Sequence, residues 1–282
     1  MTGRKPEIVC IGAQKAATSW FYRVCQDRTD IWVPPFKEVH FFDHKFCPEN
    51  RTWIQPALVR SVERAAARHS ANATRVRGRP VDKAYLAYLD SLLDTPAFNG
   101  TWYKRVFSRA PTSAKCLDVT PEYCTLPPEG VAFVAKFLRD SRFIYILRDP
   151  AARAASQLRM NLSRRKITPT THADWMRHAR DPVIANRGDY QTYIPRWRAH
   201  INPDKLLFLA YGDIRDRPAE VMRRVEAFAG LGREDPESLG QVFHKGAEMD
   251  IPEEVHAYFT DAFSDQRRFL EDTFGPDFAT RL

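Results

Sequence analysis

Five short apolar segments alternate with longer helical patterns along this chain, and that alternation limits the fold more than any other feature. The strand-like segments are rich in β-branched and aromatic residues and span 7–11, 31–33, 115–119, 142–147 and 205–211. Apolar residues recur at helical spacing over 18–26, 55–69, 81–93, 128–138, 150–161, 189–199, 218–229 and 253–273. The pattern predicts an α/β fold of three layers, with a parallel sheet of about five strands covered by helices on both faces.

The segment GAQKAATS at residues 12–19 joins the first strand to the first helix. Small residues in such a turn allow backbone N–H groups and a helix N-terminus to point at an anion. The segment has the length of the P-loop pattern G-x-x-x-x-G-K-[ST], but Ala17 replaces the second glycine, Thr18 stands at the lysine position and the only lysine is Lys15. The turn therefore predicts an anion site and disfavours a Mg²⁺-dependent kinase; a tight turn with a surface lysine is the alternative.

A second motif, RDPAARAAS, begins directly after the strand at residues 142–147. Asp149 is placed to cap the following helix, so Arg148 stands at the carboxyl end of the strand, where parallel sheets bind their ligands. Arg153 and Ser156 are i, i+3 neighbours on one helix face. A guanidinium beside a hydroxyl suits a phosphate group, whereas an arginine paired with Asp149 in a structural cap is the alternative.

The charge balance favours an anionic partner. Lysine and arginine number 43 against 35 aspartate and glutamate residues, which gives a formal net charge of +8. Such a surplus suits a phosphorylated cofactor, an acidic polysaccharide or a nucleic acid. The arginines at Arg75, Arg77 and Arg79 keep open a non-catalytic module that binds nucleic acid or acidic glycan. A mobile, solvated loop over residues 69–80 is the simpler interpretation of that cluster.

Cysteine usage and hydropathy bound the cellular class of the protein. The five cysteines include no C-x-x-C pair, so neither a disulfide framework nor a zinc site is predicted. Thiols within apolar segments indicate a reducing compartment. No apolar run approaches the ~20 residues of a membrane span, and the N-terminal residues do not read as a signal peptide. We therefore expect a cytoplasmic protein with no membrane partner.

These motifs together resemble the sulfotransferase family that depends on 3′-phosphoadenosine 5′-phosphosulfate (PAPS), closest to the heparan sulfate 3-O-sulfotransferase-like branch and its bacterial relatives. GAQKAATS is similar to the 5′-phosphosulfate loop of that family, and RDPAARAAS to its 3′-phosphate segment. Further motifs follow in the family's order: KEVHFFD at 37–43, KCLDVTPEY at 115–123, RGDY at 187–190 and HKG at 244–246. Residues 44–101 match poorly, which predicts an insertion within one domain of residues 1–282.

The resemblance implies a role for each matching residue. The phosphosulfate loop would comprise Gln14, Lys15, Ala16, Ala17, Thr18 and Ser19. The 3′-phosphate would be held by Arg148 and Ser156, and the nucleotide would be covered by Lys245 and Gly246. The acceptor would be lined by Glu38, His40, Asp43 and Lys115. Glu38 is the leading general base and His40 its rival, while Lys15 would donate to the departing oxygen.

The implied activity is transfer of a sulfuryl group from PAPS to a hydroxyl or amine of a small-molecule or carbohydrate acceptor. In-line displacement at sulfur depends on positioning and on stabilising charge, by analogy with phosphoryl transfer. No metal is expected, because one sulfonate lacks the polyphosphate that Mg²⁺ usually bridges, and no nucleic-acid partner is expected. A P-loop nucleotide kinase and the basic binding module are the alternatives, and the identity of the acceptor stays open.

Overall fold

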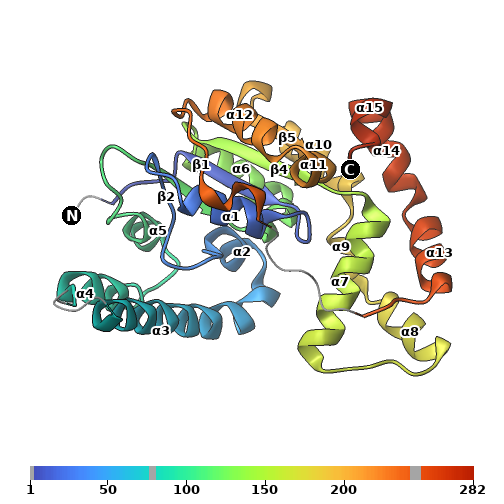
Figure 1. Ribbon diagram of the computed structural model, residues 1–282, viewed down its shortest axis with the longest axis horizontal. Helices are drawn as coiled ribbons and strands as arrows, with labels where there is room; N and C mark the ends of the chain where they lie inside the picture. The colour runs from blue at the N-terminus through green and yellow to red at the C-terminus, as the bar shows by residue number, and fades with distance from the viewer. Residues whose placement is uncertain (1–2, 76–80, 242–248) are drawn as a thin grey trace.

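The structure is a computed structural model that describes residues 3–75, 81–241 and 249–282, and of residues 73–75 only the backbone. A five-stranded parallel sheet forms its centre (Figure 1). In spatial order the strands are β2 (Ile31–Trp32), β3 (Lys115–Val119), β1 (Ile8–Gly12), β4 (Arg142–Leu147) and β5 (Leu206–Ala210). The predicted α/β fold is confirmed, and β3 and β4 have the predicted bounds.

The middle strand, β1, is the most deeply buried element of the sheet. Ile8, Val9, Cys10 and Ile11 expose no more than 1% of their surface, because β3 pairs with one edge of β1 and β4 with the other. A strand buried on both faces needs a continuous apolar run, which these residues supply. The chain passes from β1 to β2 in one direction and from β3 to β4 in the other. The carboxyl end of β1 therefore opens at the point where the strand order reverses.

Helices cover both faces of this sheet (Figure 1). One face carries α1 (Thr18–Gln26) and α12 (Pro218–Ala229). The other carries α2 (Phe41–Phe46), α6 (Pro128–Phe137) and α10 (Tyr190–Arg198). Right-handed crossovers require this division, because the connection from β1 to β2 and the connection from β3 to β4 run in opposite directions across the sheet.

A second, smaller hydrophobic cluster lies beside the main core. It is built by four helices: α7 (Pro150–Arg165), α8 (His172–Ala179), α9 (Pro182–Asn186) and α13 (Glu253–Ala262). Leu158, Trp175 and Phe259 are among its buried residues. In Figure 1 these helices stand on the right, whereas the paired helices α3 (Arg51–Arg75) and α4 (Lys83–Ser91) lie at the lower left.

Two predictions about helices are wrong. The helix predicted over 253–273 is two helices, α13 and α14 (Ser264–Phe274), which meet at Phe263. The break redirects the chain, because Phe263 packs in the second cluster whereas Leu270 packs in the main core. The loop predicted over 69–80 is helical as far as Arg75. The first residue of this segment, His69, is held by a tertiary contact: the centre of its ring lies 4.6 Å from the centre of the Tyr85 ring on α4.

The remaining elements are short. They are α5 (Gly100–Val106), α11 (Tyr211–Asp216), α15 (Pro276–Ala279) and the 3-10 helices η1 (Pro48–Asn50), η2 (Pro121–Thr125), η3 (Pro203–Lys205) and η4 (Glu237–Gly240). All five cysteines are buried free thiols. Within the described part of the chain, no helix has the length and apolar character needed to cross a membrane.

The packing around the end of β1 predicts the effect of a single methyl group. A Cβ added at Gly12 would lie 2.9 Å from the Cβ of Cys124 and 3.1 Å from the ring of Tyr145. Overpacking of this kind costs about 1–3 kcal/mol, so Gly12→Ala is expected to lower the free energy of unfolding by that amount in a urea titration. Gly240→Ala is the matched control, because nothing lies within 4 Å of its added Cβ. Equal stability of both variants would contradict the packing argument.

Candidate active site

The turn after β1 brings the N-terminus of α1 to the carboxyl end of the sheet. We call the place where this turn meets Arg148 the crevice. Lys15 and Ala17 both have positive φ, 70° and 63°, so the chain reverses tightly over residues 13–17. Ala17 is the N-cap of α1 and offers no side-chain acceptor to the first turn of that helix. Helix amides without a cap acceptor, together with the positive end of the helix dipole, favour an anion at this place.

Arg148, which follows β4, reaches across to that turn. Its guanidinium donates to the Lys15 carbonyl at 2.9 Å and lies 4.3 Å from the centre of the Tyr211 ring. The buried Nε of Arg148 has no hydrogen-bond partner in the described structure. Asp149 instead caps α7 through Ala152 N–H and pairs with Arg267, so Arg148 is free of the structural cap that was its alternative role.

The charged groups that act on Lys15 are cations, among them Arg148 and Lys37. Burial and the neighbouring Arg148 lower the pKa of Lys15 to about 8. Burial also lowers the pKa of Arg148. A lysine whose protonation is disfavoured by burial and by other cations gains stability when an anion binds beside it. The arrangement is therefore suited to a phosphate or sulfate group.

The helix that follows Arg148 places its two predicted phosphate ligands differently. Ser156 is half-buried two turns into α7. Arg153 is completely buried; it donates to Gln157 Oε1 at 2.6 Å and to the Ile184 carbonyl. The expected pairing of Arg153 with Ser156 at a phosphate is therefore not formed, because the guanidinium turns toward α9 and joins it to α7.

Glu38, His40 and Asp43 form a continuous ion-pair network below the crevice. His40 Nε2 lies 3.1 Å from Glu38 Oε2, and His40 Nδ1 lies 2.8 Å from Asp43 Oδ2. Lys37 Nζ extends the network, at 2.9 Å from Glu38 Oε1 and 3.4 Å from Thr18 Oγ1 on α1. The edge of the Trp53 ring closes over His40, with ring centres 4.8 Å apart. Through Lys37, the network thus reaches Thr18, which directly follows the Lys15 turn.

The network holds Glu38 and His40 charged. Burial opposes the charge of His40, but Asp43 and Glu38 raise the pKa of His40 to about 10. Burial likewise opposes the charge of Glu38, but Lys37 and His40 hold the pKa of Glu38 well below its usual range. At neutral pH the network therefore contains an ionised Glu38 and a protonated His40.

One predicted residue, Lys115, has surroundings that the sequence did not indicate, and two others lie outside the described residues. Lys115 is the first residue of β3, at the opposite end from the crevice, and donates to the carbonyls of Ala229 at 2.5 Å and Gly230 at 2.9 Å. The prediction that Lys115 lines the acceptor is therefore wrong, since β3 extends about 3.3 Å per residue away from the site. Lys245 and Gly246 lie outside the described residues.

The structure also adds residues that the sequence prediction left out. Lys37 joins Glu38 to Thr18, as described above. Arg187 donates to Gln14 Oε1 at 2.9 Å and pairs with the buried Glu122 at 2.8 Å. The motif KEVHFFD contained Lys37 and RGDY contained Arg187, but neither motif showed which partner each side chain would meet.

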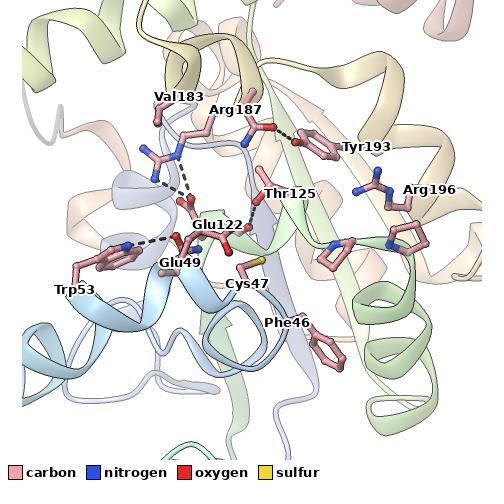
Figure 2. A pocket seen from close by; sticks show the side chains of 14 residues that line it. Phe46, Cys47, Glu49, Trp53, Glu122, Thr125, Val183, Arg187, Tyr193 and Arg196 are labelled. Carbon is pink, nitrogen blue, oxygen red and sulfur yellow. Dashed lines mark hydrogen bonds and ion pairs between the residues drawn. The ribbon is translucent and has the colours of Figure 1, made fainter.

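Two cavities lie against these groups. The first, of about 480 Å³, is lined by Trp53, Glu122 and Arg187 among others. Figure 2 shows Arg187 and Glu122 pointing toward one another and paired in the lining of this cavity, with Trp53 also in the lining. The second, of about 560 Å³, includes Ser19 and Lys37 in its lining. That lining also carries Arg23, Arg64, Arg68 and His69, and it contains no carboxylate among the described residues.

The family model "Sulfotransferase family" matches residues 6–235 of this chain. The chain belongs to the sulfotransferase family. Among curated proteins it is similar to mouse heparan sulfate glucosamine 3-O-sulfotransferase 3B1, with 27% identity over 138 residues, 47% of this chain and 35% of the mouse protein. Human heparan sulfate glucosamine 3-O-sulfotransferase 6 is 26% identical over 137 residues, 47% of this chain and 40% of the human protein. The chain thus spans well under half the length of the curated relatives it matches, and the predicted membership is confirmed.

Solved sulfotransferase structures share the fold. A sulfotransferase from Alicyclobacillus acidocaldarius superposes with a TM-score of 0.66 at 18% identity, covering 95% of both chains. Mouse sulfotransferase SULT7A1 complexed with PAP gives a TM-score of 0.52 at 14% identity, covering 100% of this chain and 91% of the mouse chain. At these identities the agreement concerns the fold, which is that of a sulfotransferase.

The raised pKa of His40 predicts how its network stabilises the protein. A group whose pKa is about 10 in the folded state and near 6.5 when unfolded contributes stability that is complete below pH 6.5 and is lost as the pH rises toward 10. The difference in unfolding free energy between the wild-type protein and His40→Gln is expected to shrink between pH 6.5 and 9.5. Urea titrations at several pH values measure it, and a difference that does not change with pH contradicts the proposed charge state.

Proposed function

We propose that this protein transfers a sulfuryl group from PAPS to a hydroxyl or amine on a small-molecule or carbohydrate acceptor. The observation that carries the proposal is the meeting of the Lys15 turn and Arg148 at the carboxyl end of β1, where neither of these two cations has a carboxylate partner among the described residues. The relatives' names support the reaction, since they are 3-O-sulfotransferases of heparan sulfate. The PAP complex of a protein with the same fold supports the nucleotide.

The donor would lie across the two turns. Lys15 and the amides of Ala16, Ala17, Thr18 and Ser19 would hold the 5′-phosphosulfate, with Gln14 fixed beside them by Arg187. Arg148 and Ser156 would hold the 3′-phosphate. The unpaired Nε of Arg148 fits that role, because a buried guanidinium N–H without an acceptor is costly until an anion binds it. Lys245 and Gly246 would cover the nucleotide, an assignment that rests on the family resemblance.

Glu38 is the group best suited to accept the proton of the acceptor. An ionised carboxylate has a free lone pair, whereas a protonated His40 has none to offer. His40 would therefore hold Glu38 in place and Asp43 would hold His40, as their distances allow. The contact with Lys37 lowers the basicity of Glu38. If the Lys37 ammonium moved from Glu38 to the sulfonate of the donor, the basicity of Glu38 would be restored.

The reaction then balances as a single displacement. The acceptor oxygen or nitrogen forms a bond to sulfur as the bond between sulfur and the bridging oxygen of the 5′-phosphate breaks. The proton of the acceptor passes to Glu38. The negative charge that develops on the departing oxygen is stabilised by the Lys15 ammonium and the loop amides. The products are the sulfated acceptor and 3′,5′-adenosine bisphosphate (PAP).

The described lining of neither cavity includes Glu38 itself, but each cavity reaches it through neighbouring side chains, and the acceptor would enter through one of them. The cavity that includes Lys37 meets Glu38 through the Lys37–Glu38 ion pair. The cavity that includes Trp53 meets it through His40. Trp53 exposes 38% of its surface and offers a flat face for a sugar or aromatic ring. Both cavities use side chains from residues 44–101, so we assign the acceptor choice to this insertion within a single domain.

The cysteines support a cytoplasmic location, which we also propose. All five are buried and unpaired, as expected for a protein that folds in a reducing compartment such as the cytoplasm. Burial raises the pKa of Cys10 and Cys124 to about 12, so these thiols stay protonated and serve as packing groups.

The donor site predicts proton uptake on binding PAP. The pKa of free Lys15 is about 8, and a bound phosphate will raise it, so at pH 8.5 the lysine takes up a proton when PAP binds. Calorimetry in two buffers of different ionisation enthalpy measures this uptake, which Lys15→Ala should abolish.

Arg148→Ala should weaken PAP binding about tenfold or more, as expected for loss of a charge-assisted pair. If PAP fails to bind while ATP with Mg²⁺ or RNA binds tightly, the kinase or the basic module replaces the proposal.

The chemical step has its own test. Incubation with labelled PAPS and a pool of phenols, amines and glycans, followed by mass analysis, should reveal a product with one added sulfonate. Glu38→Gln removes the base and is expected to lower turnover about 10²–10⁴-fold. PAP affinity serves as the control and should stay within about twofold, because Glu38 is not expected to contact the nucleotide. Wild-type turnover in Glu38→Gln would remove Glu38 from the reaction.

A further inference from the structure

Asp118 is a completely buried carboxylate on β3 that has no part in the chemistry described above. It accepts hydrogen bonds from three hydroxyl groups: Thr120 Oγ1 at 2.7 Å, Tyr103 OH at 2.8 Å and Tyr123 OH at 3.1 Å. A buried carboxylate with three donors is a strong local anchor, because each charge-assisted bond is short and geometrically demanding.

Two of these hydroxyls in turn accept from the backbone of the Glu38–Asp43 segment. Val39 N–H donates to Thr120 Oγ1 at 2.9 Å, and Phe41 N–H donates to the Tyr123 hydroxyl at 3.1 Å. These two amides flank His40. The backbone at His40 has a φ of 55°, in the left-handed region. A residue other than glycine is uncommon there and is held by its surroundings.

The direction of every bond in this relay follows from Asp118. Burial raises the pKa of Asp118 to about 6, so the carboxylate is ionised at neutral pH and can only accept hydrogen bonds. Thr120 and Tyr123 must therefore donate their single hydroxyl proton to it. Their lone pairs are then the only groups left to face Val39 N–H and Phe41 N–H. The carboxylate thus orders two hydroxyls, and the hydroxyls hold both sides of His40.

We propose that Asp118 is a positioning residue for sulfuryl transfer, which sets the orientation of Glu38 and His40 through Thr120 and Tyr123. The proposal rests on the proposed role of Glu38, but its geometry does not. Tyr103, the third donor, differs from the other two: its ring stacks on Phe41 at 4.6 Å, and its hydroxyl donates to Asp118.

Asp118→Asn is the direct test, because it keeps the shape of the side chain and replaces one hydrogen-bond acceptor by a donor. The amide NH₂ donates where the carboxylate accepted, so Tyr123 or Thr120 loses the acceptor for its proton. We expect turnover of the acceptor to fall about 10–100-fold, as for a misplacement near 1 Å, with PAP affinity and acceptor KM within about twofold. The ¹⁵N resonances of the His40 ring and the amide signals of Val39 and Phe41 should shift in the variant.

The nuclear magnetic resonance signals keep this test separate from the test of sulfotransferase activity. Shifts at His40, Val39 and Phe41 in a protein that never uses PAPS would leave the relay in place and remove only the proposed reaction. A folded Asp118→Asn with unchanged signals and turnover would overturn the relay itself.

Matched variants distinguish positioning from simple packing. Thr120→Ser keeps the hydroxyl and should retain turnover within about threefold, whereas Thr120→Val removes the acceptor for Val39 N–H and should lose about tenfold. Tyr123→Phe should resemble Thr120→Val, and Tyr103→Phe should be milder, because no amide of the segment donates to Tyr103. Equal turnover of Thr120→Ser and Thr120→Val would overturn the proposal even if Asp118→Asn failed to fold, as would a Tyr103→Phe as damaging as Tyr123→Phe.

Discussion

The hydrogen bond from the Arg148 guanidinium to the Lys15 carbonyl joins the two turns on which the site depends. It forms because β1 and β4 are adjacent parallel strands, so the segments that leave their carboxyl ends emerge side by side. The bond also brings a second cation to the place where burial already disfavours the charge of Lys15. The strand order of the sheet thus brings these two cations together at its carboxyl edge.

The partners of the arginines separate structural cations from those that face a ligand. Arg28 is completely satisfied inside the protein, pairing with Asp30 at 2.8 Å and Glu226 at 2.6 Å. Arg187 likewise pairs with Glu122. Arg153 and Arg148 both lack a carboxylate partner within the described chain and keep a buried Nε–H unsatisfied, but Arg153 joins α7 to α9, whereas Arg148 faces the Lys15 turn. Since an unpaired buried charge is costly, the retention of Arg148 points to a function rather than to stability.

Much of the fold followed from local pattern. Lys115–Val119 and Arg142–Leu147 are strands with the predicted bounds, because a buried parallel strand needs an apolar run and proline or a polar turn stops it. The Lys15 turn and Arg148 were also recognisable, since their positions after strands follow from the same pattern. Lys115 was misplaced by the resemblance, although its place at the amino end of a strand already set it on the far side of the sheet. The orientation of Arg153 depended on the Ile184 carbonyl of α9, which comes later in the chain, so no local rule predicted it.

The sequence by itself determined the strands, the two turns that carry Lys15 and Arg148, and the chemical types available at the site. Hydrophobic period, turn residues and motif order are local properties, and a single chain displays them directly. Only the tertiary structure decided that Glu38 is ionised, that His40 is protonated and that Asp118 orders the segment between them. The two charge states depend on burial in the folded chain and on side-chain contacts among Lys37, Glu38, His40 and Asp43. The ordering of the segment depends on a hydrogen bond between Val39 and Thr120, which are 81 residues apart. A pKa or a hydrogen-bond direction is a property of such a neighbourhood, which exists only once the chain has folded.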